Sequence, residues 1–335
     1  MKLIPKGSND LIRVGKSIEI TNKLLKDIES RVVALSDDFR ISIPDVNFQK
    51  VLKEKYKIDV IAGTVAYGDV KEIKRLECDN REIHSLVGLE YFTSLTYLIC
   101  NKNQLTSLDV TKNIALTQLD CYQNQLTSLD VTKNTSLTNL ECGANQLTNI
   151  DVTKNIALTQ LYCWDNKLKC LDVTSNTALI ILTCRENQLT SLDITKNTTL
   201  KLLSCNRTSL ISLDVTKNNV LNNLYCCENQ ITSLDVTKNP ALTQFHFSKN
   251  QLTELDVTKN TALRYLVCSD NNLTSLDVTR NTELAVLFCE NNQLTSLDII
   301  NNTYLYYLNL SGNPGNWWNE HEKKAKKNRV KLKKE

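Results

Sequence analysis

Cysteine is the residue type whose number and spacing first suggest chemistry in this sequence. Ten of the 12 cysteines share one register, most of them 21 residues apart: Cys78, Cys100, Cys121, Cys142, Cys163, Cys184, Cys205, Cys226, Cys268 and Cys289. Phe247 and Leu310 fill the same register in two further copies, so we predict an apolar position that holds small, buried, reduced thiols. Stacked side chains of parallel strands point the same way, which suits disulfide geometry poorly. None of the three histidines lies near a Cys-x-x-Cys pair, so no metal site is predicted.

Aspartate recurs with the same period, at the start of the five-residue sequence Asp-Val-Thr-Lys-Asn. Its ten copies are Asp109, Asp130, Asp151, Asp172, Asp193, Asp214, Asp235, Asp256, Asp277 and Asp298. A row of carboxylates could bind calcium, but the glycine-rich nonapeptide pattern of calcium-binding β-rolls is absent. We expect each Asp to cap the turn that follows it. The Lys or Arg three residues later, present in eight of the ten copies, should offset the repulsion between stacked carboxylates.

No catalytic arrangement is visible, and we predict neither an enzyme nor a bound cofactor. Gly15-Lys16-Ser17 resembles the end of a phosphate-binding loop, but residue 10 is Asp where that motif needs Gly. Cys227, outside the cysteine register, is expected on the solvent-facing side of a strand.

The elements that position these residues follow from the repeat. Ten copies of 21 residues without an insertion indicate a solenoid, and leucine-rich repeats have periods of 20–29 residues. Each copy begins Leu-x-x-Leu-x-Cys-x-x-Asn-x-Leu, as in Leu116, Leu119, Cys121, Asn124 and Leu126. This pattern resembles the leucine-rich-repeat family, and its style resembles the bacterial internalin-like type. The resemblance covers about residues 73–313. It implies an α/β-type solenoid with a parallel β-sheet on the concave face, turns or short 3₁₀ segments on the convex face, and a helical N-terminal cap.

Asn124 and its equivalents should form a buried column that bonds main-chain groups where the chain leaves each strand. Thr208 and Arg81 replace Asn in this column, so we expect the least regular turns there.

Four segments are predicted along the chain. Residues 1–40 form an amphipathic helical segment that packs on a neighbouring segment, or alternatively binds a partner or self-associates. Residues 41–72 form a capping strand and helix, with Asp45 as N-cap and Phe48, Val51 and Leu52 on the buried face. Residues 73–313 form the repeat array. Residues 314–335 form a C-terminal cap, in which Trp317 and Trp318 cover the last core layer, and a basic tail that is solvated or helical.

Charge and hydropathy limit the partners. Residues 95–304 contain 16 basic and 19 acidic residues, so no nucleic-acid partner is expected for the array. Residues 305–335 contain 8 basic and 3 acidic residues, so the tail is a weak candidate for an acidic or nucleic-acid contact. No run of 18 apolar residues exists, and no membrane span is predicted. The N-terminus lacks the apolar run of an ordinary signal peptide, so we expect a cytoplasmic monomer, with export by a non-classical route as the alternative.

The solvent-facing strand positions change from copy to copy, whereas Asp-Val-Thr-Lys-Asn hardly changes. These positions should form a concave face that binds a protein or peptide through Tyr97, Tyr122, Tyr162, Trp164, Arg185, Tyr225, His246, Tyr265, Phe288 and Tyr306. The competing interpretation is that these large side chains only pack against neighbouring strands. Two alternative functions are an exported or surface adhesin, and an intracellular signalling scaffold that docks its effector through the N-terminal helix.

Overall fold

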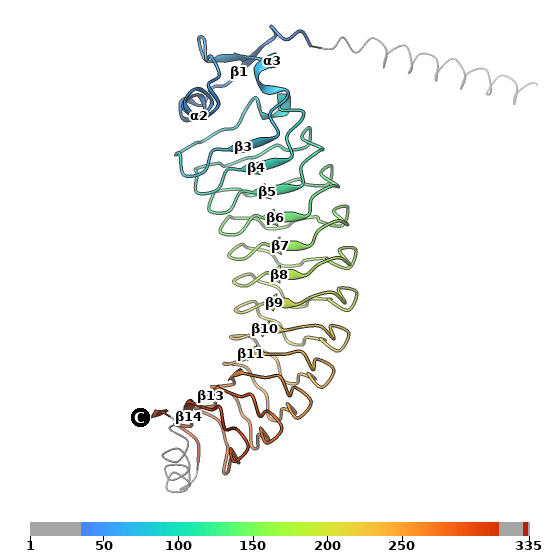
Figure 1. Cartoon of the computed structure of the whole chain (residues 1–335), viewed down its shortest axis with the longest axis vertical. Coiled ribbons are helices and arrows are strands. Elements are labelled where there is room, and N and C mark those ends of the chain that lie inside the picture. Colours follow the sequence, from blue (N-terminus) through green and yellow to red (C-terminus); the bar gives the residue numbers. More distant parts are fainter. Residues whose placement is uncertain (1–34, 315–330, 334–335) are drawn as a thin grey trace, which may run out of the picture.

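The computed structural model describes residues 35–314 and 331–333, which build a curved solenoid with one short strand in each repeat (Figure 1). The repeat strands are β3 (Arg75–Glu77), β4 (Tyr97–Ile99), β5 (Gln118–Asp120), β6 (Asn139–Glu141), β7 (Gln160–Tyr162), β8 (Ile181–Thr183), β9 (Leu202–Ser204), β10 (Asn223–Tyr225), β11 (Gln244–His246), β12 (Tyr265–Val267), β13 (Val286–Phe288) and β14 (Tyr307–Asn309). They stack in chain order, all parallel, in a sheet of 13 strands that β15 (Lys331–Lys333) completes beside β14. Equivalent residues of successive repeats are register partners, such as Leu119 and Leu140. The predicted leucine-rich-repeat fold class is confirmed.

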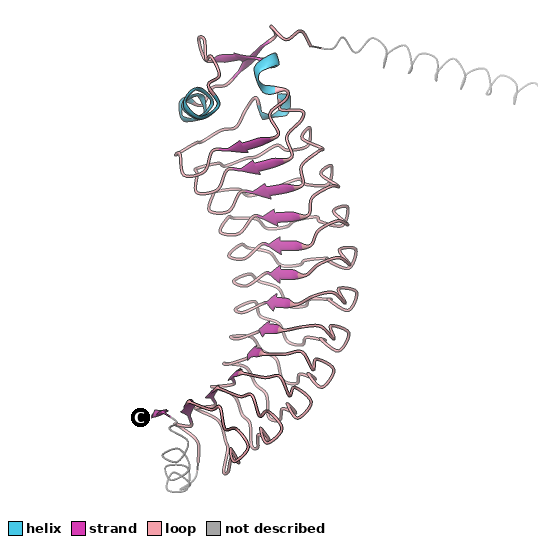
Figure 2. Ribbon diagram, viewed as in Figure 1, coloured by secondary structure: helices cyan, strands magenta, loops and turns pink. Residues whose placement is uncertain are grey.

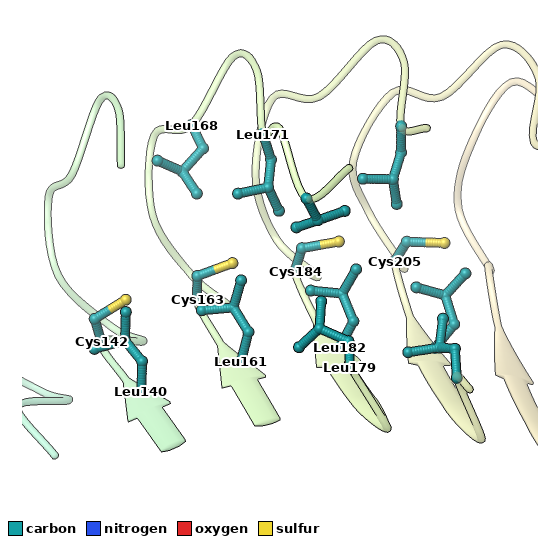
Figure 3. Close-up of a cluster of buried hydrophobic side chains, with 14 of the residues drawn as sticks. Leu140, Cys142, Leu161, Cys163, Leu168, Leu171, Leu179, Leu182, Cys184 and Cys205 are labelled. Atoms are coloured by element: carbon teal, nitrogen blue, oxygen red, sulfur yellow. The ribbon is translucent and has the colours of Figure 1, made fainter. Parts of the chain in front are cut away.

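The leucine and cysteine positions of every repeat point into one continuous core. The ten cysteines of the register are buried, as are Phe247 and Leu310 in the same column, and all 12 thiols are free. Figure 3 shows the side chains of Cys142, Cys163, Cys184 and Cys205 pointing the same way from successive repeats. Burial raises the pKa of each of these four thiols, to about 12 for Cys184. The prediction that the cysteines form a buried, apolar column is confirmed.

Turns connect each strand to the next, as the short repeat requires. In a typical copy the amide of Asn134 donates to the carbonyl of Val131 at 3.0 Å. Asp130 Oδ1 accepts the amide and the hydroxyl of Thr132 at 2.9 and 2.7 Å, which confirms that the Asp caps this turn. The threonine hydroxyl, followed by its amide, is the main reason that the pKa of Asp130 is lowered. Lys133 contributes less, so threonine rather than lysine does most to stabilise the carboxylate row.

Two columns of buried asparagine tie successive repeats together. In the predicted column, Asn124 Nδ2 donates to the carbonyls of Cys100 and Cys121 at 3.1 and 3.0 Å, and its Oδ1 accepts the amide of Leu105 at 3.0 Å. The second column was not predicted from the sequence. Its members are the last residues of the five-residue sequence, Asn113, Asn134, Asn155, Asn176, Asn197, Asn218, Asn239, Asn260, Asn281 and Asn302, all of them buried. Each donates to two carbonyls of the preceding repeats, as Asn134 does to Val110 and Asn113 at 2.9 Å.

The turns at Arg81 and Thr208 are irregular, as expected. The residue after each of them, Glu82 (φ 56°) and Ser209 (φ 89°), adopts a left-handed conformation. In the other described copies this residue, such as Gln188, does not. Without the Asn amide, the chain leaves these two strands by a different backbone path.

A small N-terminal unit covers the first repeat. It contains β1 (Arg40–Ser42), α2 (Val46–Tyr56), β2 (Thr64–Ala66) and α3 (Tyr67–Val70), and β1 pairs antiparallel with β2. Asp45 is the N-cap of α2, and Phe48, Val51 and Leu52 are its buried residues, as predicted. Phe48 stacks on Phe92, with ring centroids 6.2 Å apart. In the described residues, helices occur only in this unit and as one 3₁₀ turn, η1 (Leu89–Tyr91) (Figure 2).

Parts of the terminal predictions lie outside the described residues. These are the helical segment up to residue 34 and the capping pair Trp317 and Trp318. In the basic tail, Lys331–Lys333 form strand β15, which pairs parallel with the open edge of β14, and the rest of the tail lies outside the described residues. No described helix is long and apolar enough to cross a membrane.

Candidate interaction surface

The outer face of the sheet, here called the sheet face, presents three side chains from each repeat. Two flank the inward leucine on the strand, and the third follows the buried cysteine. Tyr97 and Tyr265 occupy the first position, with exposed fractions of 37% and 38%. The second position holds Tyr162, Tyr225, His246 and Phe288, and the third holds Tyr122, Trp164 and Arg185, all half-buried.

The prediction that Tyr306 lies on the sheet face is wrong. Tyr306 precedes β14, and Tyr307 holds the first position, because Tyr307 pairs with Val286 and Val286 with Tyr265. The 21-residue register already distinguishes the two adjacent tyrosines, because Tyr307 and not Tyr306 lies two periods after Tyr265. Tyr306 remains exposed beside the sheet.

Three predicted residues gather in one group, here called the central patch: Tyr122, Trp164 and Arg185. The ring centroids of Tyr122 and Trp164 are 6.4 Å apart, and the guanidinium carbon of Arg185 lies 4.6 Å from the Trp164 ring centroid. Gly143 lies between Tyr122 and Trp164 in the stack and leaves room for the indole. The patch therefore presents two aromatic rings and a cation, drawn from three of four successive repeats with Gly143 in the fourth, and all three side chains are partly open to solvent.

The other predicted residues form separate groups along the sheet. Tyr225 and His246 meet edge to face with centroids 4.9 Å apart, and the Tyr225 hydroxyl donates to Gln244 Oε1 at 2.5 Å. Burial lowers the pKa of His246, which favours the neutral form of its ring. Phe288 packs on Tyr307 at 4.8 Å, and Tyr97 lies beneath the guanidinium of Arg75 at 5.2 Å.

Asp120 and Glu141 form an acidic pair beside the central patch. They are register partners on β5 and β6. Asp120 is 9% exposed, and its Oδ2 accepts Asn101 Nδ2 at 2.8 Å. Burial, followed by the charge of Glu141, raises the pKa of Asp120 to about 6.

A row of alternating charges borders the sheet face and was not predicted. Arg207 lies between Glu186 and Glu228, with nitrogen–oxygen distances of 3.5 and 3.1 Å, and Lys249 Nζ lies 3.8 Å from Glu228. Opposite charges at a 21-residue spacing, immediately after the third position, are the signal that could have revealed this row. The pairs are largely exposed, so each contributes little to stability.

The described residues contain no group of three or more His, Cys, Asp or Glu side chains that could hold a metal ion. The surface grooves follow the Asp-Val-Thr turns, such as one lined by Leu234, Asp235 and Asp256. The aromatic groups lie instead on the open sheet face, which suits contact with another macromolecule better than enclosure of a small ligand.

No family model matches the chain. Internalin J of Listeria monocytogenes is 41% identical over 102 residues, which are 30% of this chain and only 11% of that protein. The solved functional domain of InlJ, which includes a cysteine ladder, has a TM-score of 0.79 at 36% identity and covers 84% of this chain and 68% of its own.

Two further solved structures share the fold. The internalin InlF of Listeria monocytogenes has a TM-score of 0.71 at 22% identity, over 87% of this chain and 95% of its own. The ectodomain of the Arabidopsis thaliana receptor kinase GASSHO1/SCHENGEN3, solved in complex with CASPARIAN STRIP INTEGRITY FACTOR 2, has a TM-score of 0.61 at 23% identity, over 68% of this chain and 31% of its own. The 21-residue repeat, the buried thiol column and the similarity to the InlJ domain together show that the chain belongs to the bacterial internalin-like leucine-rich-repeat proteins.

Proposed function

We propose that this chain is a non-enzymatic recognition module that binds a protein or peptide across its sheet face, centred on the central patch. One observation carries the proposal: Trp164 lies against Arg185 of the next repeat and close to Tyr122 two repeats earlier, and all three side chains are still partly exposed. Tyr, Trp and Arg are the residue types that most often dominate the free energy of protein–protein binding. The side chains of Tyr and Trp have only two side-chain torsions each and lose little conformational freedom when a partner covers them.

The competing interpretation, lateral packing alone, explains some groups better than others. The Tyr225 hydroxyl bonds to Gln244 and its ring packs on His246, so this pair is largely satisfied within the chain. In the central patch the indole and guanidinium stack on each other, and the half-buried rings of Tyr122 and Trp164 keep apolar surface in solvent. A partner that covers this surface gains the hydrophobic contribution that lateral packing leaves unused.

Fold similarity also supports binding of a protein ligand, since the plant receptor ectodomain is solved in complex with a partner factor. At 23% identity this likeness concerns the fold alone, so it identifies neither the partner nor the contact residues.

The test is quantitative capture of partners by the immobilised full chain. Wild type is compared with Trp164→Ala, Tyr225→Ala and the double variant, and captured proteins are quantified by mass spectrometry. Tyr304→Ala is the matched control, because Tyr304 is an exposed tyrosine (65%) that lies outside the strands. We expect Trp164→Ala to remove the specifically captured protein and Tyr304→Ala to retain it. Equal capture by wild type and the double variant would reject the sheet face as the binding surface.

A further inference from the structure

The acidic pair beside the central patch suggests what the partner offers, if the proposed sheet-face binding holds. We infer that Asp120 and Glu141, with the rings of Tyr122 and Tyr162 beside them, form a subsite that receives a lysine or arginine side chain of the bound protein.

The first support is that the two carboxylates have no cationic partner. Within residues 35–314, no Lys, Arg or His nitrogen lies within 4.0 Å of either one, whereas Glu186 and Glu228 are both paired with arginine. Asp120 and Glu141 are direct register partners on parallel strands, whose separation is about 4.8 Å. Like charges in this relation repel each other. A cation between them would remove the repulsion.

The second support is the state of the Asp120 carboxylate. Its Oδ2 accepts one hydrogen bond from Asn101, whereas its buried Oδ1 has no partner of good hydrogen-bond geometry, although the nearby Tyr122 amide helps to lower the pKa of the carboxyl. A buried charged oxygen without a partner is costly, and the cost is recovered when a donor arrives. An ammonium group has three N–H donors and a guanidinium has five, so either can serve both carboxylates at once.

The third support is the aromatic frame around the pair. Tyr162 is the register partner of Glu141 on the next strand, and Tyr122 lies two residues after Asp120. A lysine or arginine that reaches the carboxylates would lay its aliphatic stem along these rings, which also attract cations. The contribution of Glu141 to the raised pKa of Tyr162 agrees with their proximity.

The charged groups around Asp120 define the pH response. Asp79 and Glu141 add negative charge, and Lys102 lies over the Tyr122 ring with its Nζ 5.8 Å from the centroid. A bound cation favours ionised Asp120. Affinity for a cationic ligand should therefore fall as the pH drops through about 6, where Asp120 takes up a proton. Lys102 would compete with the ligand's cation for the Tyr122 ring, so Lys102→Met should strengthen binding.

The test uses Nα-acetyl-lysine methylamide, whose side-chain ammonium is free, as the probe and Nα-acetyl-norleucine methylamide as its uncharged counterpart. The chain has three tryptophans, and the indole N–H signal of Trp164 is assigned by its loss in Trp164→Phe. We expect a saturable shift of this signal with the lysine probe, at roughly millimolar concentration, and none with norleucine. Asp120→Asn with Glu141→Gln should weaken binding by about ten-fold, and Glu254→Gln, at an exposed acidic residue elsewhere, should not.

Equal shifts with the two probes, or unchanged binding by the Asp120 and Glu141 variants, would overturn the subsite. This failure is distinct from failure of the proposed function. If Trp164→Ala abolishes partner capture while the double charge variant captures normally, the sheet face binds but the partner's cation does not sit here.

Discussion

The indole of Trp164 lies against Gly143, so closely that a Cβ atom on Gly143 would come within 2.5 Å of Trp164 Cε2. The Trp164 side chain thus packs directly against the backbone of the preceding repeat. The absence of a side chain at residue 143 allows Tyr122 and Trp164 to approach each other across an intervening strand.

Gly143→Ala should therefore move the indole without unfolding the chain. A methyl group would displace the ring from Arg185, losing about 0.5–1 kcal/mol of cation–π attraction. Replacing Gly by Ala returns a similar amount by restricting the unfolded chain. We expect little change in the midpoint of chemical unfolding but a clear shift of the Trp164 indole signal and weaker partner capture. Ser248→Ala, which removes a hydroxyl without a hydrogen-bond partner at the equivalent position, is the control. An unchanged indole signal in Gly143→Ala would contradict the described packing.

Asp45 joins the N-terminal unit to the first repeat. Its Oδ1 accepts the amides of Asn47 and Phe48 at 2.9 Å, and its Oδ2 accepts those of His84 and Ser85 at 2.7 and 3.1 Å. Asp45→Ala removes the cap and strands two further amides, so it should lower the free energy of unfolding by about 2–3 kcal/mol. Asp45→Ser keeps an oxygen that can cap the helix, but this oxygen cannot also accept the amides of His84 and Ser85. The loss in the free energy of unfolding should therefore be about half that of Asp45→Ala. Equal losses in urea titrations of the two variants would show that the cap contributes nothing beyond the link to the repeat.

Thr208→Asn should stabilise the array. The single hydroxyl proton of Thr208 is shared between two acceptors, the carbonyl of Cys205 and Asn229 Oδ1. Thr208 has no amide oxygen to accept the amide of Leu189, as Asn187 Oδ1 accepts that of Leu168. An asparagine there would complete the column and add about 1 kcal/mol to the free energy of unfolding. The reverse change in a regular copy, Asn187→Thr, is the matched control and should destabilise. A loss of stability in Thr208→Asn would mean that the left-handed turn at Ser209 suits only threonine.

Thiol reactivity should separate the cysteines by burial. Cys170 is exposed, Cys227 is half-buried with a pKa raised by desolvation, and the ten thiols of the register are buried. Because the thiolate is the reactive form, a chromogenic disulfide should label Cys170 quickly, Cys227 slowly and the rest only on unfolding. Cys170→Ser should remove the fast phase. Rapid labelling of more than these two thiols in the native protein would contradict the buried column.

Asp120 and Asp109 should show opposite pH dependence. The pKa of Asp120 is raised from 3.8 to about 6, so the folded chain holds this proton more tightly, and stability falls as the pH rises through that window. Asp120→Asn should therefore gain about 2 kcal/mol at neutral pH and nothing below about pH 4. The pKa of Asp109 is lowered, mainly by the Thr111 hydroxyl, so Asp109→Asn should lose stability at neutral pH, with the loss fading as the pH falls through the lowered pKa. Thermal melts from low to neutral pH measure the stability of both variants. If the stability gain of Asp120→Asn persisted at low pH, it would not come from relief of a buried charge.

Much of the fold could be predicted because the same pattern of apolar and polar positions recurs in ten copies. The 21-residue period, the alternation around Leu119 and the apolar substitutes Phe247 and Leu310 in the cysteine column were enough to predict the solenoid, its parallel sheet and its buried thiols. Local rules also sufficed at the cap, where Asp45 precedes an apolar helical face. The irregular turn at Thr208 could be predicted because threonine lacks the side-chain amide of the asparagine that it replaces.

The tertiary structure decided what depends on distances between repeats. The sequence placed Tyr122, Trp164 and Arg185 on one face, but only the stacking over Gly143 brought them into contact and left Tyr225 in a separate pair. The second asparagine column was hidden within Asp-Val-Thr-Lys-Asn, because its partners are carbonyls 21 and 24 residues earlier. The same holds for Asp120, whose burial and proximity to Glu141 change its pKa. The repeat period and the polarity of each position can be read from the sequence. The contacts, burial and electrostatic environment of a side chain depend on how the repeats stack in space.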